Sequence, residues 1–448
     1  MTLDASAPLE VDLLLDDPAT RIIVCCGAGG VGKTTTAAAL GVRAAERGRK
    51  VVVLTIDPAR RLAQSMGIDS LDNTPRRVKG IQPGGNNNGN RNSNGNGTGA
   101  NAGELHAMML DMKRTFDEIV EAHADGERAR AILENPFYQS LSAGFTGTQE
   151  YMAMEKLGQL RARDEWDLIV VDTPPSRSAL DFLDAPKRLG SFLDGKFIKL
   201  LMAPAKMGGR AGMKFLNVGM SMMTGTLGKL LGGQLLRDVQ TFVGAMDTMF
   251  GGFRTRADAT YRLLQAPGTA FLVVAAPERD ALREAAYFVE RLAAEEMPLA
   301  GLVLNRVHGS GAAWLSAERA LAAAENLVEE RIVDHASGKT DVRDVAGASP
   351  TAPPADDTAE DEDPDDQAHE SPGDHTTEQL TAGLLRLHAE RMQVLAREQR
   401  TRDRFTALHP EVAVAEVPAL PGDVHDLAGL RAIGDQLAAG GGTPAGAA

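Results

Sequence analysis

Residues 27–34 read Gly-Ala-Gly-Gly-Val-Gly-Lys-Thr and fit the pattern G-x-x-x-x-G-K-[ST], which predicts a phosphate-binding loop. An apolar run precedes the loop and an Ala-rich helical pattern follows it, which is the context that such a loop needs. Glycines let backbone N–H groups close on phosphates, Lys33 would reach the β- and γ-phosphates, and the Thr34 hydroxyl would ligate Mg²⁺. The candidate nucleotide-binding residues here are Gly27, Gly29, Gly30, Val31, Gly32, Lys33, Thr34 and, near the α-phosphate, Thr35.

Two acidic residues end apolar runs and could complete this chemistry. Asp172 ends the run 167–172. An acid in this position can support Mg²⁺ through a water molecule, although a strand-terminal Asp can also cap a helix. Asp57 follows the run 50–56, and its carboxylate could orient an attacking water or cap a helix that begins at Pro58. The residues favour the magnesium interpretation for Asp172 and leave both roles open for Asp57.

The composition is that of a globular protein without a general nucleic-acid signal. The 448 residues carry a net charge of −14, and the segment 355–374 alone holds ten acidic and no basic residues. No run of 18 apolar residues suggests a membrane span, and the five acids of residues 1–18 do not fit a signal peptide. Adjacent Cys25 and Cys26 would point to opposite faces of a strand, as small core residues do. We expect a cytoplasmic protein, with a peripheral membrane location as the alternative.

Apolar runs alternate with helical patterns along most of the chain. This alternation predicts an α/β fold with a doubly wound, mostly parallel sheet, whose ligands bind beyond the carboxyl ends of the strands. Strands are expected at 21–26, 50–56, 104–110, 167–172, 269–275, 299–307 and 411–417, and helices at 33–47, from Pro58, from about 112, at 280–294 and from about 424.

The same pattern predicts a nucleotide-binding core with a helical insertion. The core would comprise residues 1–110, 166–185 and 266–448, and the helical subdomain residues 111–165 and 186–265. Two segments are too poor in apolar residues to offset the entropy of ordering, so we expect them to be disordered. They are the Asn/Gly-rich insertion 83–103 and the acidic linker 336–377.

A methionine-rich and basic stretch stands out in the expected helical subdomain. Eight of the 17 methionines lie between Met202 and Met249, and residues 195–236 hold six basic and no acidic residues. Methionine surfaces adapt to varied apolar partners, but Phe242, Met246 and Met249 also have the spacing of a helix core face. The stretch could therefore form a groove for a hydrophobic client or an ordinary core.

The order of the motifs resembles that of the ArsA family of ATPases, which includes the arsenite-pump ATPase and the ATPase that targets tail-anchored membrane proteins. The resemblance is carried by the loop at 27–34, by Thr55-Ile-Asp57-Pro-Ala and by Val171-Asp172-Thr-Pro-Pro175. Shorter matches are Ala276-Pro-Glu278 with Arg283-Glu284, Leu304-Asn305-Arg306 and Val417-Pro418.

The resemblance implies a P-loop NTPase with a deviant Walker A loop that hydrolyses MgATP in a dimer. It implies that Asp57 in switch I orients water, with Lys33 at the phosphates, and that Asp172 belongs to switch II. It further implies that Asn305 reads the adenine, that the loop near Pro418 covers the base, and that Glu284 reaches the nucleotide region. The expected cofactors are ATP and Mg²⁺.

Ala28 departs from the family pattern, because the family has a lysine there that reaches the partner subunit's nucleotide. Alanine can neither donate a hydrogen bond nor carry charge. A heterodimer with a lysine-bearing homologous subunit is therefore favoured over a homodimer. The family's zinc-binding Cys-x-x-Cys pair and its arsenite cysteines are also missing, so we do not expect a zinc-linked dimer or an arsenite pump.

The leading expectation is an ATPase whose dimer cycle controls a hydrophobic client surface on the helical subdomain, with no nucleic-acid partner. One alternative is a non-catalytic nucleotide-binding subunit of a heteromeric complex. The other is a positioning ATPase of the MinD/ParA kind, although the helical insertion and the Asp-Pro-Ala switch disfavour it.

Overall fold

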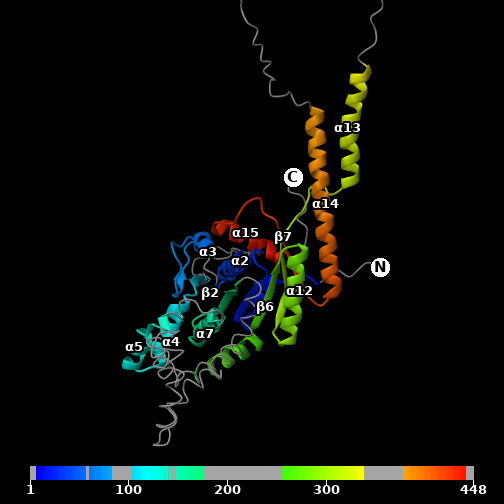
Figure 1. Ribbon diagram of the computed structural model, residues 1–448. Helices are drawn as coiled ribbons and strands as arrows, with labels where there is room; N and C mark the ends of the chain where they lie inside the picture. The colour runs from blue at the N-terminus through cyan, green and yellow to red at the C-terminus, as the bar shows by residue number, and fades with distance from the viewer. Residues whose placement is uncertain are drawn as a thin grey trace, which may run out of the picture. The chain divides into compact units, whose positions relative to one another are not determined.

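A computed structural model describes residues 7–56, 60–82, 103–136, 138–139, 142, 148–174, 252, 255–337 and 377–439 of the chain (Figure 1). It divides into two compact units. The first comprises residues up to His308 and from Glu398 onward, and the second comprises Gly309–Arg397. The expected core had included the whole second unit, and the expected disordered segments 83–103 and 336–377 lie almost entirely outside the described residues.

The first unit is built on one sheet, which has eight strands within the described residues. All neighbours pair in parallel except β3, which pairs antiparallel with β4 at the edge. In spatial order the strands are β3 (Arg76–Arg77), β4 (Glu104–Met109), β2 (Lys50–Thr55), β5 (Leu168–Asp172), β1 (Ile22–Gly27), β6 (Thr269–Ala275), β7 (Leu299–Val307) and β8 (Val414–Pro418). The predicted doubly wound, mostly parallel α/β sheet is confirmed.

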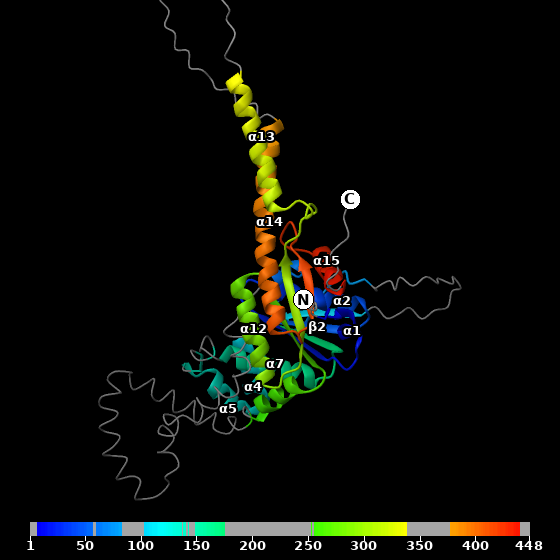
Figure 2. The ribbon, with the colours of Figure 1, turned by 90° about the vertical axis from the view of Figure 1, so that its right-hand side faces the viewer.

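Helices cover both faces of this sheet (Figures 1 and 2). One face carries α1 (Val11–Asp16), α2 (Lys33–Glu46) and α15 (Leu427–Ala438), whose apolar residues form one core. The other face carries α4 (Met112–His123), α5 (Gly126–Leu133), α7 (Thr148–Ala162) and α12 (Arg279–Ala294), which share a second core. The short α3 (Arg60–Ser65) follows β2.

The central strands are buried along their whole length, which explains their unbroken apolar runs. Their side chains alternate between the two cores: Ile22, Val24 and Cys26 face the α7 side, and Ile23 and Cys25 face the α2 side. The two cysteines therefore point to opposite faces, as predicted. Both are free thiols.

The second unit consists of the two long helices α13 (Ala317–Ser337) and α14 (Thr377–Leu408) with the loop before them; the last residues of α14 belong to the first unit. Alanines supply the buried positions, at Ala320 and Ala324 of α13 and Ala382 and Ala389 of α14. The side chains of α14 hold the loop before α13, because Arg391 donates to the Gly309 carbonyl and His388 Nε2 lies 2.8 Å from the Leu315 carbonyl. The sequence did not predict these two helices.

Candidate nucleotide-binding site

The loop between β1 and α2 requires glycine at two close approaches. At Gly27 (φ +147°) a Cβ atom would overlap the carbonyl of Val274 on β6. At Gly32 (φ +95°), the residue that begins α2, a Cβ would overlap the Nδ2 atom of Asn305. Both positions also have positive φ, which L side chains adopt at a cost. The glycines therefore let the loop pass between β6 and the end of β7.

Lys33 stands in the first turn of α2 and is almost fully buried. Its Nζ atom donates to the carbonyl of Ala28 at 2.8 Å, so the ammonium lies inside the curve of the loop. An ammonium has three donors, and backbone amides at a helix N-terminus also favour anions. This arrangement is suited to a triphosphate, as the motif predicts.

Three polar residues, from the first turn of α2 and from the ends of β5 and β2, meet beside the loop. Oδ2 of Asp172, at the end of β5, accepts from Thr34 Oγ1 at 2.6 Å and from Thr55 Oγ1 at 2.9 Å. Asp172 lies opposite Cys25 of β1 and Thr55 of β2 in the parallel register, and it is fully buried. The structure therefore brings together the loop threonine and the predicted Walker B acid, 138 residues apart in the chain.

Hard cations such as Mg²⁺ take oxygen ligands, and this group supplies a hydroxyl next to a carboxylate. The residues present fit MgATP: Thr34 would ligate the ion, Asp172 would hold it through water, and Lys33 with the loop amides would hold the phosphates. Bound Mg²⁺ would neutralise charge on the phosphoryl oxygens.

Thr173 fixes the end of β5 against the loop strand. Its Oγ1 and its backbone N–H both donate to the carbonyl of Cys25, at 2.9 and 3.2 Å. Next to it, burial raises the pKa of the Cys26 thiol to about 12, and burial, with Asp172 nearby, raises the pKa of Cys25 well above its usual range. Both thiols therefore stay protonated and act as core residues.

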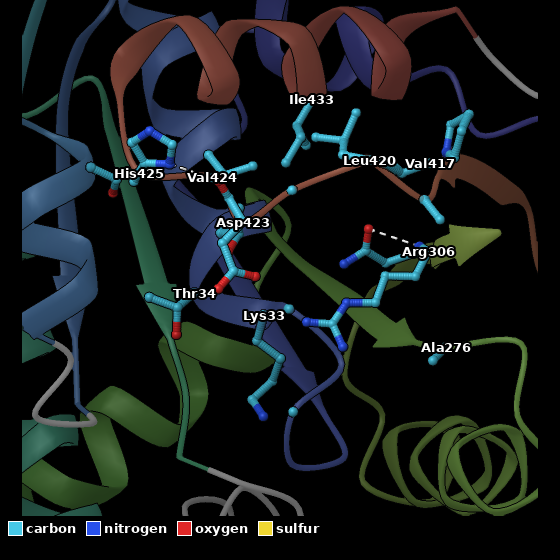
Figure 3. Close-up of a pocket in the computed structure, with 18 of the residues that line it drawn as sticks. Lys33, Thr34, Ala276, Arg306, Val417, Leu420, Asp423, Val424, His425 and Ile433 are labelled. Carbon is cyan, nitrogen blue, oxygen red and sulfur yellow. Dashed lines mark hydrogen bonds between the residues drawn. The ribbon is translucent and has the colours of Figure 1, made fainter. Parts of the chain in front are cut away.

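Asn305 ends the buried part of β7 and holds the phosphate loop from the side. Its Nδ2 atom donates to the carbonyl of Val31 at 2.8 Å, and its Oδ1 accepts from the backbone N–H of Arg306 at 3.0 Å. Arg306 has a left-handed backbone (φ +62°), which is uncommon outside glycine. Figure 3 shows its side chain extending from the end of β7 into the pocket.

These residues line a pocket of about 1270 Å³ in the first unit. Its walls include Gly29, Gly30 and Gly32 with Lys33, Thr34 and Thr35, and also Asn305 and Pro418, whereas Gly27 and Val31 of the predicted set are not among the lining residues. Glu284 lies exposed on α12 and is not among the lining residues, whereas Glu278 at the start of that helix is. Lining residues that the sequence did not single out include Ser65, His308 and Glu398, whereas Thr173 and Arg306 belong to the matched motifs and the loop 419–425 follows Pro418.

The loop 419–425 joins β8 to α15 and closes the pocket opposite the phosphate loop (Figure 3). It contributes an acid, Asp423, and an imidazole, His425, next to apolar Leu420 and Val424. The resemblance pointed to this loop at Pro418, and the run Pro418-Ala-Leu-Pro-Gly422 is a turn sequence directly after a parallel strand.

Several predicted residues lie outside the described part of the chain. They are Asp57, Pro175 and the methionine-rich stretch from Met202 to Met249 with its basic residues. Their roles stay predictions. Ala28 is described: it is only 8 % exposed, and its methyl group belongs to the core on the α2 side of the sheet.

A strand, a glycine loop closed on a lysine, and a neighbouring strand that ends in an acid beside the loop threonine define a P-loop nucleoside triphosphatase. The model of the anion-transporting ATPase family matches residues 20–313, and the chain belongs to this family. The resemblance inferred from the motifs is confirmed at the level of the family. The chain is therefore an ATPase of the P-loop class, as predicted.

Curated relatives agree with this assignment. The chain is 24% identical to "ATPase GET3" of Podospora anserina over 68% of this chain and 78% of the relative. It is 26% identical to "ATPase ARSA2" of Chlamydomonas reinhardtii over 66% of this chain and 70% of the relative. With "ATPase GET3" of Malassezia globosa it shares 29% identity over 42% of this chain, and that match spans 49% of the relative's length.

Among the helices that the structure describes, none combines the length and the apolar character that a membrane span needs.

Proposed function

We propose that this chain binds and hydrolyses MgATP and that this cycle opens and closes a dimer of homologous subunits. The observation that supports it best is the hydrogen bond from Thr34 to Asp172 beside the closed loop around Lys33. Lys33 and Thr34 line the pocket of about 1270 Å³, and Asp172 is hydrogen-bonded to Thr34, which supports a role of these residues in binding MgATP. In this proposal Asp57 orients the attacking water, Asn305 and the loop after Pro418 bind the base, and the cycle takes place in the cytoplasm.

The first test compares wild-type protein with Lys33→Ala. Wild type should bind ATP with Mg²⁺ and release phosphate, and Lys33→Ala should lose both because the phosphates lose their buried cation. Lys113→Ala is the matched control, since Lys113 is an exposed residue of α4 that forms an ion pair with Asp117. ATP binding that is unchanged in Lys33→Ala, together with no phosphate release by wild type, would refute the proposal.

Ala28 supports a heterodimer with a lysine-bearing homologue. A homodimer would have no lysine at this position to offer in trans, and trans-acting cations in related reactions are worth roughly 10³–10⁵ in rate. The chain alone should therefore turn over slowly and accelerate by about 10³-fold or more when mixed with such a homologue. A purified self-dimer with full activity would refute the heterodimer.

A client surface is proposed for the helical region between residues 111 and 265. The support is compositional: the eight methionines of residues 202–249 and the basic residues around them suit a hydrophobic segment with acidic or membrane-bound flanks. Photo-crosslinkers placed in this stretch should capture apolar segments in the ATP-bound state. Equal capture with and without ATP would contradict a nucleotide-controlled surface.

The alternative of a non-catalytic nucleotide-binding subunit rests on the same Ala28. It predicts ATP binding without phosphate release, even with the homologous subunit present. Phosphate release assayed with an Asp57→Asn variant in the mixed complex separates the two, because only a catalytic site in this chain loses rate. A positioning ATPase of the MinD/ParA kind stays a third alternative.

A further inference from the structure

Ile56 is the last residue described before Asp57, and both its backbone N–H and its backbone carbonyl form hydrogen bonds. It is 1% exposed. Its N–H donates to the backbone carbonyl of Asp172 at 3.1 Å, which joins the end of β2 to the end of β5. Its carbonyl accepts a hydrogen bond from Nε2 of Gln149 at 3.0 Å. The predicted switch I and switch II segments and the first turn of α7 therefore meet at one buried peptide.

The Gln149 bond fixes the orientation of the peptide that leads to Asp57. The peptide unit is planar, so the carbonyl of Ile56 and the N–H of Asp57 turn as one body. A buried carbonyl without a hydrogen-bond partner costs free energy. Orientations of the peptide that would break the bond to Gln149 are therefore disfavoured. Gln149 thus fixes the peptide that leads to Asp57, and it is not among the residues that line the pocket.

The helix that carries Gln149 is firmly seated. Apolar residues of α7 are buried around its whole circumference, and its charged residues Glu155, Lys156 and Arg161 form ion pairs. Lys156 donates to Glu118 of α4 at 3.0 Å, and Glu155 accepts from Arg256 at 2.7 Å. A donor on such a helix can hold a peptide in place, whereas a donor on a loose surface loop could not.

The Arg256 pairing also gives α7 a contact with the part of the chain that follows the methionine-rich stretch. Arg256 lies in the helix over 255–265, and its Nε contacts Glu155, which is two turns from Gln149 on the same helix. A displacement of α7 would therefore reach the end of β2 through the Gln149 bond.

We propose that Gln149 is a positioning residue that holds the carboxyl end of β2 for ATP hydrolysis and ties it to α7. This inference rests on the proposed function, in which Asp57 orients water. A side chain that is misplaced by about 1 Å can cost roughly 100-fold in rate, so the bond should affect turnover far more than nucleotide affinity. Gln149 touches neither ATP nor Mg²⁺ in this proposal.

The test uses the full chain, with its homologous partner if turnover requires it. Gln149→Ala removes the donor, and Gln149→Glu keeps the size but presents an acceptor to the Ile56 carbonyl. Gln159→Ala, a half-buried glutamine further along α7, is the matched control. We measure kcat, the Kd for ATP and amide hydrogen exchange of a peptide that covers residues 50–56.

Both Gln149 variants should lower kcat by about 10- to 100-fold, with the Kd for ATP within about threefold of wild type. Exchange across residues 50–56 should speed up in both variants and stay unchanged in Gln159→Ala. The kcat of Gln149→Glu should fall at least as far as that of Gln149→Ala. The loss of the hydrogen-bond donor, rather than the loss of side-chain volume, causes the defect in this proposal. Gln149→Glu carries the test if Gln149→Ala does not fold.

The inference is overturned if kcat stays within twofold of wild type in both variants, or if kcat and affinity fall together. Failure of the proposed function has a different signature: wild type then binds ATP without releasing phosphate under any condition. In that case a role of Gln149 in hydrolysis falls with it, and exchange over 50–56 still decides whether Gln149 holds the end of β2.

Discussion

Thr34 Oγ1 and Asp172 Oδ2 lie 2.6 Å apart, although 138 residues separate them in the chain. The contact exists because β1 and β5 are neighbours in the sheet and end at the same edge. A hydroxyl that donates to a carboxylate keeps its lone pairs for a metal ion. The bond therefore orients the Thr34 oxygen toward the position where Mg²⁺ would bind.

Thr34→Ala should raise the Mg²⁺ concentration needed for half-maximal ATP hydrolysis by about tenfold or more, because the ion loses a ligand and Asp172 loses a donor. Titration of phosphate release with Mg²⁺ measures this. Thr34→Ser keeps the hydroxyl and should stay near wild type. Equal Mg²⁺ requirements for the alanine and serine variants would contradict a ligand role.

Gly32→Ala and Gly30→Ala should differ, although both glycines have positive φ. A Cβ at Gly32 would overlap Nδ2 of Asn305, whereas a Cβ at Gly30 has no atom within 4 Å. Gly30→Ala should cost about 1–2 kcal/mol from backbone strain alone. Gly32→Ala should in addition separate Asn305 from the loop and weaken ATP binding at least ~10-fold. Calorimetric titration with ATP checks this, and equal affinities would refute the Asn305 contact.

Thr55→Val should destabilise the fold, because it removes a buried donor to Asp172 with little change in volume. The hydrogen bond spans 2.9 Å, and Thr55 is fully buried. A hydrogen bond to a charged group contributes roughly 1.5–3 kcal/mol. Urea unfolding should show a loss of that order. Thr55→Ser, which keeps the hydroxyl, should recover most of it if the bond rather than packing is responsible.

Stability should fall at alkaline pH because of Cys26. Burial raises the pKa of this thiol to about 12, while in the unfolded chain it titrates near its usual value. Between about pH 9 and 12 the unfolded state therefore loses its proton first, and each unit costs up to ~1.4 kcal/mol of folding free energy. Below about pH 9 the thiol is protonated in both states, so its ionisation no longer lowers the free energy of unfolding.

Urea unfolding at pH 8 and pH 10 checks this in wild type and Cys26→Ala. The variant should lose less stability between the two pH values, since it has no thiol to ionise at this position. Cys25 is also buried and has a raised pKa, so Cys25→Ala should behave alike. Identical losses in wild type and both variants would show that other groups dominate.

The features that the sequence predicted are those formed by short, continuous segments of the chain. β6 and β7 have the bounds that their sequence patterns predicted, and β6 is an unbroken apolar run because it is buried along its whole length. The loop at 27–34 and Asp172 were likewise evident, since the motif fixes the side chains relative to one strand end. The position of Asp57 stays a prediction.

The rest depends on contacts between distant segments. The bond from Gln149 to the Ile56 carbonyl joins residues 93 apart, and a lone glutamine gives no pattern that predicts it. Glu278, the residue that precedes α12, lines the pocket, whereas Glu284 further along the helix is not among the lining residues and its role stays a prediction. The helices α13 and α14 were missed because the buried residues described in their second-unit parts, Ala320, Ala324, Ala382 and Ala389, are alanines, which give a weak apolar periodicity.

His308 and Glu398, the residues on either side of the second compact unit, are bonded to each other through Nδ1 and Oε1 at 2.5 Å. The chain thus leaves the first unit and returns to it at two residues that are in contact, so the intervening Gly309–Arg397 has the connectivity of an insertion. A length change inside such an insertion need not alter the register of any strand. Relatives could therefore lengthen, shorten or exchange this hairpin in evolution while the nucleotide pocket keeps its walls.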